Sequence, residues 1–350
     1  MGRNGRFINA LGAVVKNSVR MEADHFRLDL SREETQRLFG NHVELIEVET
    51  TSYCNRTCSF CPNNFIDRHS KELPMPEHSW QAILEGLSEV DYEGTFVWSR
   101  YSEPLSERRI VDRIREVREA APRSRICINS NGDYLDADYL SELERTGLDR
   151  LWIDLYIPDD EGYDLEVATN YYNKFLKRIE RTGTVTATHP ELACRISSPQ
   201  LGIVSHVRNV TVMKAMDMSD RGGLVQIARE TSRVAPCYAP YKHLVIDWDG
   251  SIVVCCQLRS DSPTHKTAVV GKIGVDGVGL TDAYVRLAKW REGLRSYGPK
   301  GGPCSTCNVS EYESNRFTRV LSRFLGDTDS ATSGFFRTAL RPLTGKKQRY

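Results

Sequence analysis

The chain has 350 residues, and its 47 lysine and arginine residues balance 47 aspartate and glutamate residues, so the formal net charge is zero. This neutral balance argues against bulk binding of nucleic acid, and no apolar run approaches the length of a membrane span. Hydrophobic residues make up 40% of the chain, which suits a globular protein with one large and one small domain.

Residues 1–43 are expected to form an extension before the main domain. Arg3 and Arg6 precede a short apolar stretch at residues 7–15, which ends at Lys16. A secretory signal peptide would carry a small-residue cleavage site after its apolar part, and none follows here. We therefore expect a docking helix at residues 7–15 and a cytoplasmic location.

Strand and helix signals alternate from residue 44 to about 215, which predicts parallel strands joined by right-handed crossovers. The expected strands cover residues 45–48, 95–99, 125–129 and 151–156, with a late strand at 210–213. The expected helices cover residues 76–87, 107–120, 137–146 and 171–181. Residues 182–206 give no clear signal. The pattern predicts an α/β domain over residues 44–235, with its ligand site at the carboxyl ends of the strands.

A different pattern begins near Cys237. Two β-rich runs meet at Asp249 and Gly250, which is a strong hairpin signal, and a helix is expected at residues 281–295. We predict a smaller domain over residues 236–320. The basic tail at residues 321–350 is expected to be solvated or loosely docked.

Three cysteines lie in one short loop directly after the first expected strand. Cys54, Cys58 and Cys61 have the spacing C-x3-C-x2-C. Three thiolates can hold three irons of a [4Fe–4S] cube and leave the fourth iron to a small chelating molecule. Zinc sites usually close with four ligands in paired C-x2-C units, and a disulfide framework does not suit a reducing compartment. The trio therefore predicts an iron–sulfur cluster.

This loop, with Phe60 just before its last cysteine, resembles the radical SAM enzymes. In that family the cluster reduces S-adenosylmethionine (SAM), and the resulting 5′-deoxyadenosyl radical takes a hydrogen atom from a C–H bond. The resemblance implies a partial (β/α)6 TIM-like barrel and an electron donor such as flavodoxin or ferredoxin. The residues that it implies for the cluster and for SAM are Cys54, Cys58, Cys61, Phe60, Glu103, Ser130 and Asn131. For residues 131–133, a simple turn is an equally good interpretation.

Four further cysteines can close a second site. Cys237 and Cys255 flank the hairpin, and Cys304 and Cys307 form a C-x2-C pair. The residues alone do not separate structural zinc from a second [4Fe–4S] cluster. The arrangement resembles the Twitch domain, the short form of the SPASM extension of radical SAM enzymes, which implies an auxiliary cluster. No cysteine follows Cys307, so we expect two clusters in total.

Residues 102–105, 131–135 and 219–223 resemble radical SAM dehydrogenases that act on aminocyclitols. The resemblance implies that Arg221 contacts a substrate hydroxyl, although a solvated surface arginine is the plain alternative. Tyr101 and Gln257 are weaker substrate candidates. The dehydrogenases have an aromatic and then an acidic residue after the second Twitch cysteine, where this chain has Cys256 and Gln257.

A thiol can give a hydrogen atom to a carbon radical, as in radical SAM carbohydrate epimerases, so Cys256 is the expected donor. The alternative is that Cys256 is a small core residue. Cys127 and Cys194 are rival donors, and Cys127 lies in an expected strand.

The first hypothesis is therefore an enzyme of antibiotic biosynthesis that epimerises a carbinol carbon of a small-molecule sugar or cyclitol. Oxidation of that carbinol to a ketone is the second hypothesis. Peptide modification is the third, and the segment before residue 44 is too short for the usual leader-binding domain. A non-enzymatic metal or redox protein is the fourth. No nucleic acid or membrane partner is expected.

Overall fold

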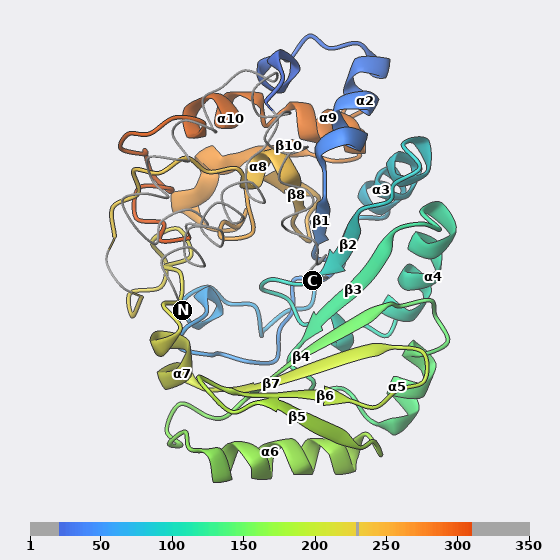
Figure 1. The fold of residues 1–350 in the computed structure, drawn as a ribbon. Helices are drawn as coiled ribbons and strands as arrows, with labels where there is room; N and C mark the ends of the chain where they lie inside the picture. Colours follow the sequence, from blue (N-terminus) through green and yellow to red (C-terminus); the bar gives the residue numbers. More distant parts are fainter. Residues whose placement is uncertain (1–20, 229–230, 310–350) are drawn as a thin grey trace, which may run out of the picture.

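The computed structural model describes residues 21–228 and 231–309. The described strands form one sheet in the order β10-β9-β8-β1-β2-β3-β4-β7-β6-β5 (Figure 1). Its parallel strands are β1 (Leu45–Val48), β2 (Thr95–Trp98), β3 (Arg125–Ser130), β4 (Arg150–Tyr156), β7 (Gly202–Arg208) and β8 (His243–Ile246). Antiparallel pairing adds β5 (Gly183–Ala187), β6 (Leu192–Ile196), β9 (Ser251–Val253) and β10 (Val269–Lys272).

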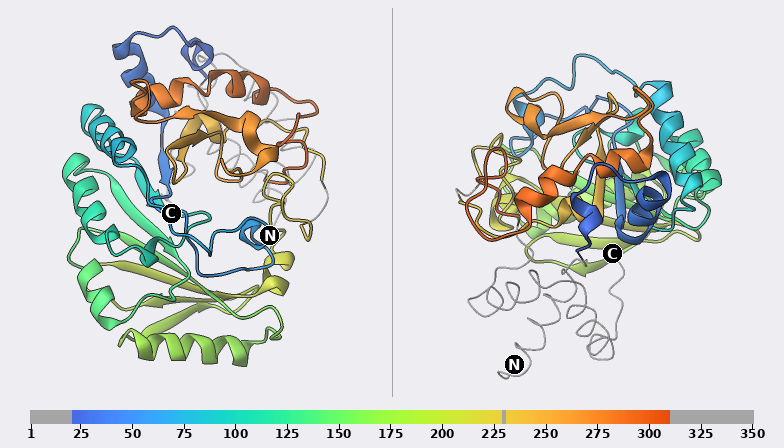
Figure 2. Two further views of the ribbon diagram at one scale, coloured as in Figure 1. Left: turned by 180° about the vertical axis from the view of Figure 1, so that it is seen from behind. Right: turned by 90° about the horizontal axis from the view of Figure 1, so that it is seen from above.

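Helices cover the outer side of the curved sheet, and the loops at the strand ends gather on its inner side (Figure 2). The outer helices are α3 (Glu77–Glu89), α4 (Ile110–Ala120), α5 (Ala137–Leu143) and α6 (Leu165–Arg178). The remaining helices are α2 (Arg32–His42), α7 (Val210–Ala215), α8 (Ala239–Lys242), α9 (Leu280–Val285) and α10 (Ala288–Leu294). Short 3-10 turns are η1 (Ala23–Phe26), η2 (Pro62–Asn64), η3 (Pro104–Ser106) and η4 (Pro263–Ala268).

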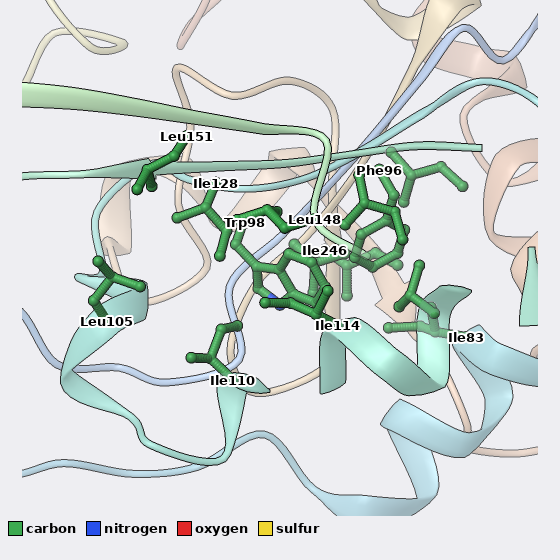
Figure 3. Close-up of a cluster of buried hydrophobic side chains, with 14 of the residues drawn as sticks. Ile83, Phe96, Trp98, Leu105, Ile110, Ile114, Ile128, Leu148, Leu151 and Ile246 are labelled. Carbon is green, nitrogen blue, oxygen red and sulfur yellow. The ribbon is translucent and has the colours of Figure 1, made fainter. Parts of the chain in front are cut away.

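The core lies between the sheet and these outer helices (Figure 3). Helix α4 contributes Ile110, Ile114 and Val117, which are fully buried and recur at the helical spacing of three to four residues. They face strand residues such as Phe96 and Trp98, which are also fully buried. Each such side chain stabilises the fold by about 1.5–3 kcal/mol, so the site at the strand ends has a rigid support.

Two expectations from the sequence are wrong in detail. Residues 210–213 are not a strand but lie in helix α7, because the side chain of Asn209 accepts a hydrogen bond from the amide of Val212 at 3.1 Å and so caps a helix. The single helix expected at residues 281–295 is two helices, α9 and α10. The buried guanidinium of Arg291 donates to the carbonyl of Tyr284, which satisfies the backbone where α9 ends.

The other expected elements are present within a few residues, and the hairpin is formed by β8 and β9. Residues 182–206, which gave no clear signal, contain β5, β6 and part of β7. Strands β8–β10 extend the same sheet as the barrel strands, and the predicted domain boundaries at residues 44, 236 and 321 stay predictions. The expected docking helix at residues 7–15 and the basic tail lie outside the described residues. Among the described helices, none is long and apolar enough to span a membrane.

Candidate active site

A cavity of about 260 Å³ opens at the carboxyl ends of strands β1 to β4. Ten residues singled out from the sequence line it, namely Cys54, Cys58, Phe60, Cys61, Tyr101, Glu103, Ser130, Asn131, Arg221 and Cys256. They come from the cysteine loop, three strand ends, the turn at residues 219–223 and the segment after the hairpin. The position is the one expected for a parallel α/β sheet.

The cysteine loop is fixed by bonds to neighbouring strand ends. Arg56 makes a two-pronged ion pair with Asp133, with Nε and Nη2 at 2.6 and 2.7 Å from the carboxylate oxygens. Asn55 donates to the same carboxylate at 2.7 Å, and Arg56 also donates to the carbonyl of Tyr156 at 3.0 Å. Bidentate charged bonds of this kind impose geometry as well as stability, so the three thiols are held in place over the cavity.

The chemistry of these thiols fits a metal cluster. Burial raises the pKa of Cys54 and of Cys58 to about 12 in spite of the nearby charge of Arg56, so both would stay protonated at neutral pH without a bound metal. Bound iron would supply that positive charge and deprotonate them. No three His, Cys, Asp or Glu side chains within the described ranges are arranged around a single ion. A [4Fe–4S] cube needs no such arrangement, because its protein thiolates bind different irons.

Glu103 is a buried cavity side chain that is fixed by three hydrogen bonds. Its carboxylate accepts hydrogen bonds from Ser130 Oγ at 2.6 Å, the amide of Asn131 at 2.7 Å and the amide of Leu105 at 3.0 Å. Burial raises the pKa of Glu103 to about 7 against these three bonds. The carboxylate is therefore held rigidly at the strand ends, where it suits a cationic group such as the amine of SAM.

The segment at residues 131–133 is a turn that also lines the cavity. The side-chain oxygen of Asn131 accepts from the amide of Asp133 at 2.9 Å, and Gly132 has a φ of 75°. The nitrogen of the same side chain donates to Asn55 Oδ1 at 2.8 Å. Both interpretations of this segment are thus compatible, because the turn presents Ser130 and Asn131 to the cavity.

A second corner of the cavity brings together Arg221, Cys256 and Gln257. Arg221 Nη1 donates to the side-chain oxygen of Gln257 at 3.2 Å, and Gln257 Nε2 lies 3.4 Å from the sulfur of Cys256. The hydroxyl of Tyr101 donates to the carbonyl of Gln257 at 2.9 Å. Cys256 lines the cavity, whereas Gln257 is not among the lining residues and bonds to both Arg221 and Cys256. Cys127 and Cys194 are buried in strands β3 and β6 and do not line the cavity.

Sequence reasoning missed several residues of the cavity wall, among them Glu47, Ser99, Arg100, Asp154 and Tyr156. One signal was present. Strand β1 carries Glu47 and, two residues further along the chain, Glu49 among apolar residues, and buried charges in a strand usually serve a site or an ion pair. The carboxylate of Glu49 accepts from the amides of residues 101 and 102, whereas Glu47 faces the cavity.

Comparison with known protein families agrees with this geometry. The radical SAM superfamily model matches residues 48–187, and the SPASM iron–sulfur cluster-binding domain matches residues 237–308. The chain is a radical SAM enzyme. The partial barrel and the small C-terminal domain are thereby confirmed, and the non-enzymatic hypothesis is wrong.

Curated relatives of this radical SAM enzyme differ in how much of the chain they match. The S-adenosyl-L-methionine-dependent 2-deoxy-scyllo-inosamine dehydrogenase of Niallia circulans is 24% identical over 283 residues, which are 79% of this chain and 98% of that protein. GTP 3′,8-cyclase of Chlorobaculum tepidum is 25% identical over 160 residues, 43% of this chain and 46% of that protein.

The crystal structure of BtrN in complex with AdoMet and 2-DOIA has a TM-score of 0.53 and 22% identity. The match covers 79% of this chain and 97% of the BtrN chain, and it supports the fold.

The cofactors of this radical SAM enzyme are SAM and two [4Fe–4S] clusters. The residues predicted for the auxiliary cluster fit that assignment. Cys237, Cys255, Cys304 and Cys307 are all half-buried free thiols. Arg233 Nη1 lies 3.6 Å from the sulfur of Cys307, where a cation suits a thiolate. Their roles as individual ligands stay predictions.

Proposed function

We propose that the enzyme inverts a carbinol carbon of a sugar or cyclitol, with Cys256 as the donor of the replacing hydrogen atom. The observation that carries this proposal is the position of Cys256, whose side chain lines the same cavity as Cys54, Cys58, Cys61 and Glu103. A substrate in this cavity would lie between the SAM side and the thiol.

The residues of this chain divide the work of such a reaction. Bound SAM and its cluster supply a 5′-deoxyadenosyl radical. Cys54, Cys58 and Cys61 would hold the cluster, Glu103 would hold the amine of SAM, and Arg221 would donate hydrogen bonds to a substrate hydroxyl. One hydrogen atom leaves the carbon and forms 5′-deoxyadenosine, and the S–H of Cys256 delivers another from the opposite face. The sulfur then needs one electron and one proton to return to the thiol.

Oxidation of the carbinol to a ketone is the second candidate. It is favoured by the match to a dehydrogenase over 98% of that relative's length. In that reaction the carbon radical loses its hydroxyl proton and one electron, and the auxiliary cluster would supply the acceptor for that electron. The substrate class is the same in both candidates, a small polyhydroxylated ring.

Radical generation also needs a one-electron reductant. A flavodoxin or ferredoxin is the proposed electron donor, and a cytoplasmic location, where such proteins and labile clusters are maintained, is proposed with it.

The test is product analysis in heavy water. Anaerobically reconstituted enzyme is incubated with SAM, dithionite and a panel of cyclitols, aminocyclitols and aminoglycosides. Inversion leaves the skeleton unchanged and adds one deuterium, because the thiol exchanges with solvent, whereas oxidation removes two hydrogens. Cys256→Ala is expected to abolish deuterium incorporation, and Cys127→Ala, which changes a buried thiol away from the cavity, is expected to retain it. Inverted, deuterated product from Cys256→Ala would refute the donor role.

A further inference from the structure

Glu47 is a buried carboxyl group that none of the SAM or cluster assignments uses. It lies in the middle of β1, between Val97 of β2 and Val245 of β8, and only 8% of the residue is exposed. A carboxylate among apolar strand residues is costly unless hydrogen bonds or charges compensate it. Its side chain lines the cavity, so the compensation can come from a ligand.

The protein itself satisfies Glu47 only in part. Oε1 accepts a hydrogen bond from the hydroxyl of Ser99, and Oε2 has no hydrogen bond from any described residue. Glu49, by contrast, accepts from the amides of residues 101 and 102 at 2.7 and 2.9 Å and pairs with Arg68. The contrast between two carboxylates of one strand shows that Glu49 serves the fold, whereas Glu47 keeps an acceptor free toward the cavity.

Nearby positive charges offset the negative charge of Glu47 but form no ion pair with its carboxylate. Arg100 is the cation that acts on it most strongly, but the guanidinium of Arg100 is held by Asp247 and by the carbonyl of Leu258. Burial raises the pKa of Glu47, and the charges of Arg100 and Arg221 oppose that rise. Arg221 has no carboxylate partner within the described residues, since its guanidinium donates to the neutral side chain of Gln257.

Cys256 shares this corner with both charged groups. Glu47, Arg221 and Cys256 all line the same cavity, and Gln257 bonds to both Arg221 and Cys256. The corner therefore presents a hydrogen-bond acceptor, a hydrogen-bond donor and a hydrogen-atom donor to one volume. A secondary alcohol has the matching groups, because its O–H donates and its oxygen accepts.

We infer that Glu47 accepts the hydrogen bond of the hydroxyl on the reacting carbon, while Arg221 donates to the oxygen of that or a neighbouring hydroxyl. This inference rests on the proposed function and names the residue that orients its substrate. The pairing fixes the carbon relative to Cys256 and to the SAM side of the cavity. If the radical is oxidised instead of inverted, Glu47 would accept the hydroxyl proton as the C–O bond becomes C=O, and the auxiliary cluster, which Cys237, Cys255, Cys304 and Cys307 would hold, would supply the acceptor for the electron.

Glu47→Gln tests the inference, because it keeps the shape and removes the charge. Its matched control is Glu44→Gln, the same change beside the same strand on an exposed side chain. Three quantities are measured with the converted member of the panel: 5′-deoxyadenosine formed without substrate, kcat and KM, and product formed per 5′-deoxyadenosine. We expect substrate-free SAM cleavage to be unchanged in both variants. For Glu47→Gln, kcat/KM should fall about 10- to 100-fold, the usual effect of losing a hydrogen bond to a charged group.

A substrate analogue separates orientation from general damage. The analogue lacks the reacting hydroxyl and is used as an inhibitor. For the wild type, its dissociation constant should be about 10- to 100-fold higher than that of the substrate. In Glu47→Gln this preference should collapse, because the hydroxyl loses its charged acceptor: Ser99 donates to one oxygen position, and the other position becomes an NH2 group, which cannot accept a hydrogen bond. Equal turnover by Glu47→Gln and wild type would overturn the inference and leave the proposed function intact. Loss of substrate-free SAM cleavage would place Glu47 in the fold or the SAM site and would also overturn it. If the wild type cleaves SAM but converts none of the compounds in the panel, the proposed function itself is refuted.

Discussion

Arg291 is predicted to be the residue on which the small C-terminal domain depends most. Its side chain is fully buried in α10, and no carboxylate among the described residues pairs with it. Instead it donates to the carbonyls of Pro240 at 3.0 Å, His25 at 3.1 Å and Tyr284, and its guanidinium stacks 3.7 Å from the ring centroid of Tyr284. One side chain thus joins η1, α8, α9 and α10.

Arg291→Met keeps most of the volume, removes the donor of the His25 and Pro240 carbonyls, and leaves the Tyr284 carbonyl with only backbone donors such as the amide of Leu287. Hydrogen bonds to charged groups contribute about 1.5–3 kcal/mol each, and removal of the buried charge returns part of that, so we expect a loss of about 3–5 kcal/mol. That is a large share of the roughly 5–15 kcal/mol that stabilises a typical domain. Because Cys237 and Cys304 lie on either side of this hub, the auxiliary cluster should be lost before the SAM cluster.

Denaturant unfolding and iron analysis check this expectation. The variant should unfold at lower denaturant, and its iron content should fall from about eight toward about four per chain while SAM cleavage persists. The control is Arg295→Met in the turn after α10, where the side chain is 47% exposed and pairs with Glu292, so at most about 1 kcal/mol should be lost. Equal stability of the two variants would refute the view that buried carbonyl bonding makes Arg291 essential.

Three further predictions concern the cysteine loop, the hydrogen bond of Tyr101 beside the cavity, and stability in acid. Cys58→Ala should abolish 5′-deoxyadenosine formation while the auxiliary cluster and the cooperative unfolding transition persist, as iron analysis and calorimetry would show. Tyr101→Phe removes the bond to the carbonyl of Gln257, so product per 5′-deoxyadenosine should fall several-fold with about 0.5–1.5 kcal/mol lost in stability. Burial lowers the pKa of His25 to about 3, whereas its pKa in the unfolded chain is near 6.5. Below pH 6.5 only the unfolded chain binds this proton, so the free energy of unfolding is highest above pH 6.5 and decreases as the pH falls toward 3. The wild type should lose roughly 3 kcal/mol between pH 7 and pH 4 through this group, and His25→Gln should show a flatter pH dependence of the unfolding free energy.

The barrel half of the site was predictable because its chemistry is local in sequence. Cys54, Cys58 and Cys61 occupy one loop, and Glu103 and Asn131 each follow a strand whose carboxyl end must face the same edge of the sheet. Repeated strand and helix signals along the chain fix that edge, because right-handed crossovers keep consecutive strands parallel. The mistaken strand at residues 210–213 arose where β-branched residues outweighed the cap at Asn209, which alone starts helix α7.

The other half was not predictable because it depends on long-range packing. Glu47 and Glu49 have the same sequence signal, and only the backbone amides of residues 101 and 102 decide that Glu49 is used internally. Likewise, Gln257 was a substrate candidate, yet it is not among the residues that line the cavity and instead bonds to Arg221 and Cys256. Such roles follow from which groups meet across the sheet, and no pattern along the chain records that.

The contact between the barrel and the segment after the hairpin determines the shape of the cavity. Arg100, at the end of β2, has a φ of 87°, a costly conformation for a residue with a side chain, of the order of 1–3 kcal/mol. The strain is tolerated because the guanidinium of Arg100 is fixed by the buried Asp247 and the carbonyl of Leu258. The same segment carries Cys256, so the side chain proposed to decide the product is held by a bond that crosses from the barrel. In the proposed reaction the barrel would serve radical generation and the segment docked on it would decide the fate of the substrate radical. Both parts line the cavity.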